Sequence, residues 1–165
     1  LDVRDDPERV GSAFAEWVNQ WLGGWERLRW MHIEQPVQKA RTSGKPLALA
    51  RMGSADNLAD WKAQWQALQA QAHLSPEQAS QPPQPGQALI PLQALLLGKG
   101  HIALAQRWAQ ALSAVDARMR QLGTQSTQDD WLRLAQDMKA VTVLYQSEVA
   151  AALDVPLGFS DADGD

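Results

Sequence analysis

The stretch that decides the fold runs from Val10 to Gln35 and reads VGSAFAEWVNQWLGGWERLRWMHIEQ. It contains four of the chain's eight tryptophans. At about 100° per residue, its large apolar side chains fall on one face of a helix. That face consists of Val10, Phe14, Trp17, Trp21, Trp25, Leu28 and His32. Because so much aromatic surface must be buried against other elements, we predict that this helix builds the core of a helical fold.

Helix-starting and helix-breaking residues predict where this first helix begins and ends. Asp6 suits the N-cap position and Pro7 the first helical position, so the helix should begin at Pro7. The pair Gly23-Gly24 should weaken its middle and kink or split it. Pro36 should end the helix near Gln35 or bend it sharply. Residues 36–55 stay ambiguous, with a turn signal in the sequence TSGKP at 42–46.

Three further long helices are predicted from apolar residues at heptad spacing, over 56–73, over 101–122 and from Ser126 or Thr127 to Leu153. Gly123 should end the second of them in a left-handed conformation. The apolar seams are Leu58, Trp61, Trp65, Leu68 and Ala72; Ala105, Trp108, Leu112, Val115, Met119 and Leu122; and Trp131, Leu134, Met138, Val141, Tyr145 and Ala152.

Shorter segments join these helices. Residues 75–78 fit a capped helical turn, and the proline-rich sequence QPPQPG at 81–86 fits an extended connector. A short buried helix should begin at Pro91. We therefore predict an all-α fold, a four-helix bundle with one or two short additional helices. The chain would be one domain, 1–165, made of a helical hairpin at 7–80, a connector at 81–87, a second hairpin at 88–153 and an acidic tail at 154–165.

Composition excludes several kinds of site. The chain has no cysteine, so disulfides, thiolate metal sites and cysteine nucleophiles are absent. The longest apolar stretch, 88–97, is interrupted by Pro91 and Gln93 and is too short to cross a bilayer. No signal peptide is visible. Since the chain starts at Leu1 rather than at a methionine, its natural start stays open. The compartment stays open too: the cytoplasm is preferred, with a periplasmic or membrane-anchored fragment as the alternative.

Charge is distributed unevenly along the chain. The net charge of −4 argues against general nucleic-acid binding. Between Arg27 and Arg51, six basic residues face Glu34 alone, a net charge of +5. From Thr124 onward, two basic residues face eight acidic ones, a net charge of −6. The plainer interpretation is that the two regions attract each other within the fold or are solvated, and the alternative is that one of them binds a partner.

No cluster of residues predicts catalysis or metal binding. The histidines, His32, His73 and His101, lack the spacing of a metal motif, and the repeated Glu-x-x-His pair of di-iron bundles is missing. The sequence GKG at 98–100 lacks the rest of a phosphate-binding loop. The acidic sequence at 161–165 stops before the glutamate that a calcium loop requires. We therefore predict a protein that is not an enzyme and has neither a metal nor a cofactor.

Two sets of residues are candidates for binding. Trp17, Trp21, Trp25 and His32 would line a pocket between helices, unless they only pack the core. Arg27, Arg29 and Trp30 form the second set. Trp30 lies about 160° around the helix from the apolar face, and tryptophan and arginine are enriched at interface hot spots. Trp30 could equally be covered by the segment at 36–55.

The sequence as a whole favours a non-catalytic interaction or scaffold protein, an adaptor that binds an acidic protein partner through Arg27, Arg29 and Trp30. One alternative is a ligand-binding sensor bundle with a tryptophan-lined pocket. Another is an amphipathic coat protein of membrane or storage-granule surfaces. Neither a nucleic-acid partner nor a transmembrane segment is expected, and formation of a homo-oligomer stays open.

Overall fold

The computed structural model describes residues 7–45, 47, 54–81 and 90–157. Every regular element among these residues is helical, so the chain is all-α as predicted. The elements, with η marking π-helical segments, are α1 (Pro7–Glu26), η1 (Arg27–Glu34), α2 (Gln35–Ser43), α3 (Ser54–Ala72), α4 (Pro76–Ala79), α5 (Leu92–Gly98), α6 (Ile102–Gln121), α7 (Gln128–Leu144), η2 (Tyr145–Val149) and α8 (Ala150–Ala152).

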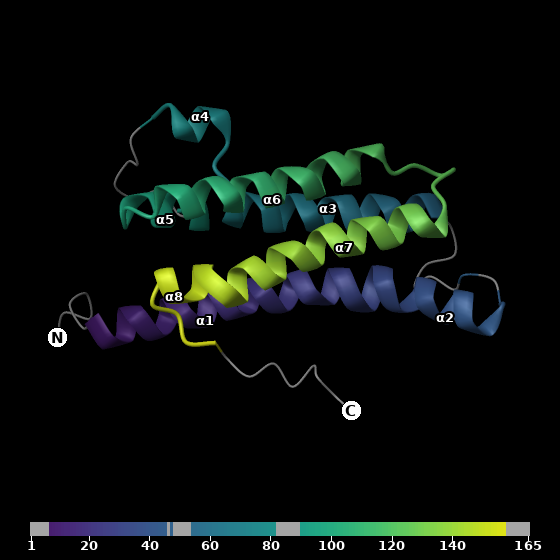
Figure 1. The fold of residues 1–165 in the computed structure, drawn as a ribbon, viewed down its shortest axis with the longest axis horizontal. Helices are drawn as coiled ribbons and strands as arrows, with labels where there is room; N and C mark the ends of the chain where they lie inside the picture. Colours follow the sequence, from purple (N-terminus) through teal and green to yellow (C-terminus); the bar gives the residue numbers. More distant parts are fainter. Residues whose placement is uncertain (1–6, 46, 48–53, 82–89, 158–165) are drawn as a thin grey trace.

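The long helices lie side by side as a bundle (Figure 1). The α1–η1–α2 helix packs on α7 and α3, and α6 packs on α7, α3 and α5. The short helix α4 stands off from the rest of the bundle beside α5 (Figure 1). This arrangement confirms the predicted bundle, with α4 and α5 as its short additional helices.

The first helix continues through Pro36, so the prediction that this proline ends it near Gln35 is wrong. The segments α1, η1 and α2 follow one another without a break from Pro7 to Ser43, and the Gly23-Gly24 pair does not split the helix. In a regular α-helix the proline ring would clash with the carbonyl four residues earlier. Just before Pro36 the hydrogen bonds span five residues instead, as from the Gln35 N–H to the Trp30 carbonyl. We attribute the continuity of the helix to these wider turns.

The π-helical segment also shifts the buried face by one residue. Leu28 is fully buried, and the next fully buried residue on the face is Ile33, five positions later, followed by Val37. His32 is partly buried, and the neighbouring Ile33 takes the fully buried position instead. Val10, at the other end of that face, is exposed. The buried part of this face therefore starts after Val10 and continues to Val37, beyond the predicted end of the helix at Gln35.

The three later helices bury the predicted seams. Trp61 and Trp65 of α3, Trp108 and Leu112 of α6, and Met138 of α7 are all buried. The core is joined by aromatic contacts between helices that are distant in sequence. The ring centroids are 5.2 Å apart for Trp25 and Trp65, 5.3 Å for Trp61 and Trp131, and 5.7 Å for Trp21 and Trp108. The hydrophobic core therefore draws on both halves of the chain.

The ends of the helices follow most, but not all, of the predictions. Ser75 and Thr127 each cap a helix with a reciprocal capping box, and Gly44 ends α2 at φ 63°. Gly123 is not left-handed, so that prediction is wrong: α6 ends because Leu122 turns to an extended conformation and buries its side chain. Most of the predicted proline-rich connector lies at 82–89, outside the described residues.

Candidate interaction surface on the first helix

The outward face of η1 carries Arg27, Trp30 and Met31. All three are exposed and lie within about one turn of η1, so they belong to the same part of the helix surface. The exposed fraction is 39% for Trp30 and 58% for Met31. All eight tryptophans lie within the described residues. Seven of them are buried or partly buried, and Trp30 is exposed. Of the two positions that the sequence leaves open for Trp30, the structure shows the exposed one.

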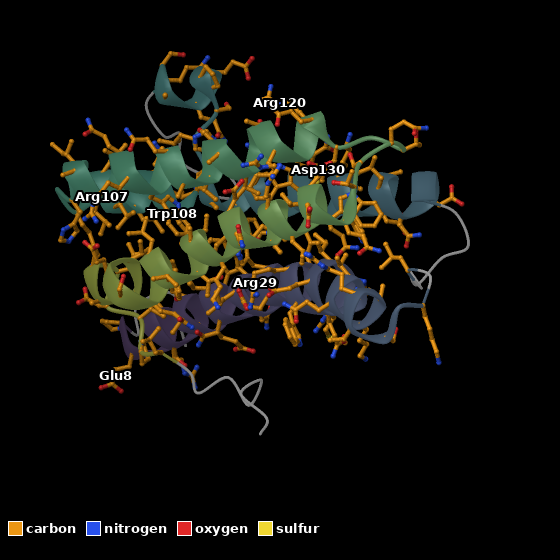
Figure 2. All side chains as sticks on the ribbon, turned by 45° about the vertical axis from the view of Figure 1, so that its right-hand side comes forward. Glu8, Arg29, Arg107, Trp108, Arg120 and Asp130 are labelled. Atoms are coloured by element: carbon orange, nitrogen blue, oxygen red, sulfur yellow. The ribbon has the colours of Figure 1, made fainter. Side chains whose placement is uncertain are left out.

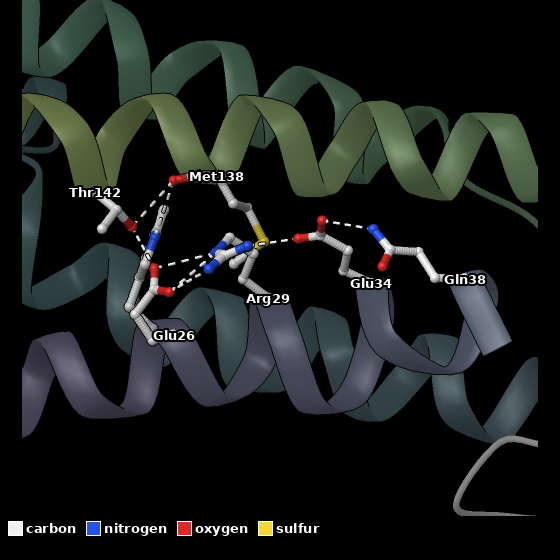
Figure 3. A network of polar contacts seen from close by, with 7 residues as sticks. Glu26, Arg29, Glu34, Gln38, Met138 and Thr142 are labelled. Carbon is white, nitrogen blue, oxygen red and sulfur yellow. Dashed lines mark hydrogen bonds and ion pairs between the residues drawn. The ribbon is translucent and has the colours of Figure 1, made fainter. Parts of the chain in front are cut away.

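The inward face of η1 is fixed by apolar packing and by a polar network. Leu28 and Ile33 are fully buried in the core. Beside them the guanidinium group of Arg29 lies between η1 and α7 (Figures 2 and 3). Arg29 Nε donates to both carboxylate oxygens of Glu26 at 3.0 and 3.1 Å, and its Nη1 donates to Glu34 Oε2 at 2.5 Å. This network holds η1 in one orientation against the bundle.

Neighbouring side chains extend the network at both ends (Figure 3). Thr142 of α7 donates its hydroxyl hydrogen bond to Glu26. Gln38 of α2 donates through Nε2 to Glu34 Oε1 at 2.9 Å. Burial by itself would lower the pKa of Arg29, but the hydrogen bonds and charges of the two glutamates outweigh burial and raise this pKa above its ordinary value. The guanidinium group therefore stays charged.

The structure separates the three residues of the predicted partner surface. Arg27 and Trp30 face outward. The Arg29 side chain is only 13% exposed, and its guanidinium group forms salt bridges with two carboxylates. Arg29 therefore belongs to the inward face of η1 and not to the exposed surface. Sequence reasoning did not include Met31, although its spacing of four residues from Arg27 places it on the same face. It had also placed Arg29 outside, although Arg29 follows the buried Trp25 by four residues.

Both interpretations of the uneven charge find some support. Arg41 Nη1 lies 3.0 Å from Asp129 Oδ1, so one ion pair joins the basic and acidic regions. Arg27, Lys39 and Lys45 are exposed. Within the described part of the chain, none of the three forms a salt bridge. Part of the basic excess near η1 is therefore left unpaired at the surface.

The proposed tryptophan pocket is filled by packing at Trp21 and Trp25. Their rings stack with centroids 5.4 Å apart. Trp21 Nε1 donates to the Leu68 carbonyl at 3.0 Å, and Trp25 Nε1 donates to the Met138 carbonyl at 3.1 Å. Among the hollows of the described surface, three have linings that contain none of the residues predicted for the pocket. Those residues are Trp17, Trp21, Trp25 and His32.

The described residues add two further findings. Their histidine, aspartate and glutamate side chains form no group of three or more that could hold a metal ion. None of the helices in the described ranges has both the length and the hydropathy needed to cross a bilayer.

The fold and this surface define an all-α helical bundle whose longest helix presents a tryptophan outward. Comparisons with models of protein families, with curated protein sequences and with solved structures find no match to this chain.

Proposed function

We propose that the protein is a non-catalytic interaction module, an adaptor or scaffold, that binds an acidic protein partner through Arg27, Trp30 and Met31 on η1. The observation that carries this proposal is the exposure of Trp30, since the other seven tryptophans are buried or partly buried. Tryptophan and arginine are the residues most enriched in interface hot spots, and methionine is also enriched at interfaces.

The rigidity of the surface supports the proposal. Leu28 is fully buried beneath it, and Arg29 is bonded to Glu26 and Glu34 beside it. A surface that is already ordered loses less conformational freedom on binding, so more of the contact energy remains as affinity. Trp30 would then act as the anchor, inserted into a pocket of the partner.

The charges around the surface favour an acidic partner. Arg27, Lys39 and Lys45 are exposed on this helix or at its end, and the two nearby glutamates, Glu26 and Glu34, are bonded to Arg29. A partner with carboxylates opposite these cations would associate faster at low salt, because complementary charges steer the encounter. Binding should weaken as salt screens the exposed charges.

Site-specific photocrosslinking tests this function. A photoreactive amino acid at position 31 should capture a partner, and the same amino acid at Ile102, which is equally exposed at the start of α6, should not. Trp30→Ala in the position-31 protein should abolish capture, and added salt should reduce it. Equal capture from both positions would contradict the proposal. Binding to anionic lipid vesicles in place of a protein would favour the coat-protein alternative.

A further inference from the structure

A second feature, separate from the η1 face, lies where α4 stands off from α3, α5 and α6 (Figure 1). A hollow of about 1130 Å³ opens there. Its apolar wall includes Leu74, Ala94 and Leu97, and Leu97 is exposed although it is a large apolar side chain. This volume is slightly above the usual range for small-molecule sites, about 300–1,000 Å³, and such sites combine apolar walls with a few placed polar groups.

One polar group of the hollow is the carboxylate of Asp116 on α6. Its Oδ1 accepts a hydrogen bond from Nε1 of the buried Trp65 at 3.0 Å, which fixes the carboxylate in place. Its Oδ2 pairs with Arg120, whose guanidinium group also lines this hollow. The side chain of Asp116 is 22% exposed and that of Arg120 is 75% exposed. Because exposed arginines contribute little through such pairs, Arg120 can leave Asp116 at small cost.

A second polar group of the hollow is the imidazole of His73, directly after α3. It is partly buried, and within the described part of the chain its ring makes no hydrogen bond. Burial lowers the pKa of His73, although the charge of Asp116 acts in the opposite direction. The ring is therefore mainly neutral near pH 7 and offers a lone pair to a donor. Two acceptors, one of them anionic, thus lie in the same hollow.

We propose that this hollow binds a primary amine with an aliphatic body, whose ammonium group replaces Arg120 at Asp116 and donates to His73. A primary ammonium group carries the positive charge that Asp116 attracts and has a hydrogen for each of the two acceptors. Its aliphatic chain lies against Leu74, Ala94 and Leu97. The lining supports a cation over an anion, because Glu77 adds a second negative charge and, among the described residues of the lining, Arg120 alone is an arginine or lysine.

The indole N–H of Trp65 reports on this site, since it is bonded to Asp116. In ¹H–¹⁵N spectra of the intact chain, n-hexylamine at neutral pH should shift this resonance saturably. Hexanol, which lacks the charge, and hexyltrimethylammonium, which lacks the donors, should bind at least about tenfold more weakly. Asp116→Asn keeps an oxygen for Trp65 but loses the charge, and it should weaken hexylamine binding about tenfold or more. Glu148→Gln, which changes an exposed carboxylate away from the hollow, should leave binding unchanged.

A further variant keeps the test valid if Asp116→Asn affects folding. Leu97→Gln replaces an exposed apolar side chain of the wall, so the protein should keep its stability and still bind hexylamine several-fold more weakly. The proposal is overturned if hexylamine causes no saturable shift, if the three compounds bind equally well, or if Leu97→Gln and Asp116→Asn both leave the affinity unchanged.

Discussion

Thr142 on α7 donates a hydrogen bond to the carboxylate of Glu26 at the end of α1, and the same carboxylate accepts from Arg29. The contact joins residues far apart in the sequence and lies where the first helix changes from α to π-helical. It is part of a hydrogen-bonded ion cluster that lies between the first helix and α7 (Figure 3). The polar cluster and the neighbouring core together fix which side of η1 faces the bundle and which side faces outward.

Removing the charge of Arg29 should destabilise the fold. Arg29→Met keeps most of the volume but leaves Glu26 and Glu34 without their partner, which should cost about 3 kcal/mol, the lower end of the range for breaking a buried ion pair. Urea denaturation would measure the loss. Arg107→Met removes an arginine that makes a bidentate pair with Glu148 on the exposed surface, and it should change little. Equal losses for the two variants would show that burial does not set the strength of the Arg29 cluster.

Gly23→Ala should stabilise the protein by about 0.5–1 kcal/mol, because Gly23 lies within regular helix and a Cβ there meets open space. Gly24→Ala is the matched comparison, since its Cβ would lie 3.4 Å from Leu68 Cδ2. The gain there should be smaller. Thermal unfolding of the two variants checks this prediction, and a loss of stability in Gly23→Ala would mean that position 23 does not face solvent.

Tyr145→Phe should leave the protein equally stable or stabilise it by about 1 kcal/mol. The Tyr145 hydroxyl is buried, and no partner for it is found in the described residues, so its desolvation is uncompensated. A loss above about 1 kcal/mol in chemical denaturation would reveal a partner such as a bound water.

The same residue predicts a dependence on pH. Burial raises the pKa of Tyr145 from 10.0 to about 12. The neutral phenol is therefore favoured in the folded state, and its advantage is complete below pH 10 and lost as the pH rises from 10 to about 12. The free energy of unfolding of the wild type should fall relative to that of Tyr145→Phe over this interval. A constant difference across it would contradict the burial of the hydroxyl.

Trp108→Ala should destabilise the fold by about 3–5 kcal/mol, the usual range for emptying a large aromatic site in a core. Trp108 is fully buried, and its Nε1 donates to the Ala72 carbonyl at 2.9 Å. Trp65→Ala should cost a similar amount, because Trp65 is also buried. A loss below about 1 kcal/mol in either variant would mean that the seam is not part of the core.

The helices and most of their buried faces could be predicted because heptad spacing is a local property of the sequence. The seam from Ala105 to Leu122 on α6 is buried throughout. The π-helical segments could not be predicted in this way. The wider turn adds about one residue between Leu28 and Ile33, and heptad spacing does not predict it. Contacts between distant residues, such as the hydrogen bond between Thr142 and Glu26, cannot be read from a local pattern either.

The candidate surface was predictable in part for the same reason. The angular position of Trp30 on the helix indicated an outward side chain, but the direction of Arg29 depended on carboxylates that bind it from the same helix. The hollow near His73 could not be inferred, because Asp116 comes from a different helix, 43 positions later in the chain. Such a site exists only once α3 and α6 are packed together.

The most direct test of the proposed function measures the melting temperature of Trp30→Ala and its affinity for the partner captured at position 31, side by side. If Trp30 is a surface anchor, the melting temperature should stay nearly unchanged, while the affinity falls by about 2 kcal/mol or more, roughly thirtyfold. A large drop in the melting temperature, or an unchanged affinity, would contradict the proposal that η1 is the binding surface.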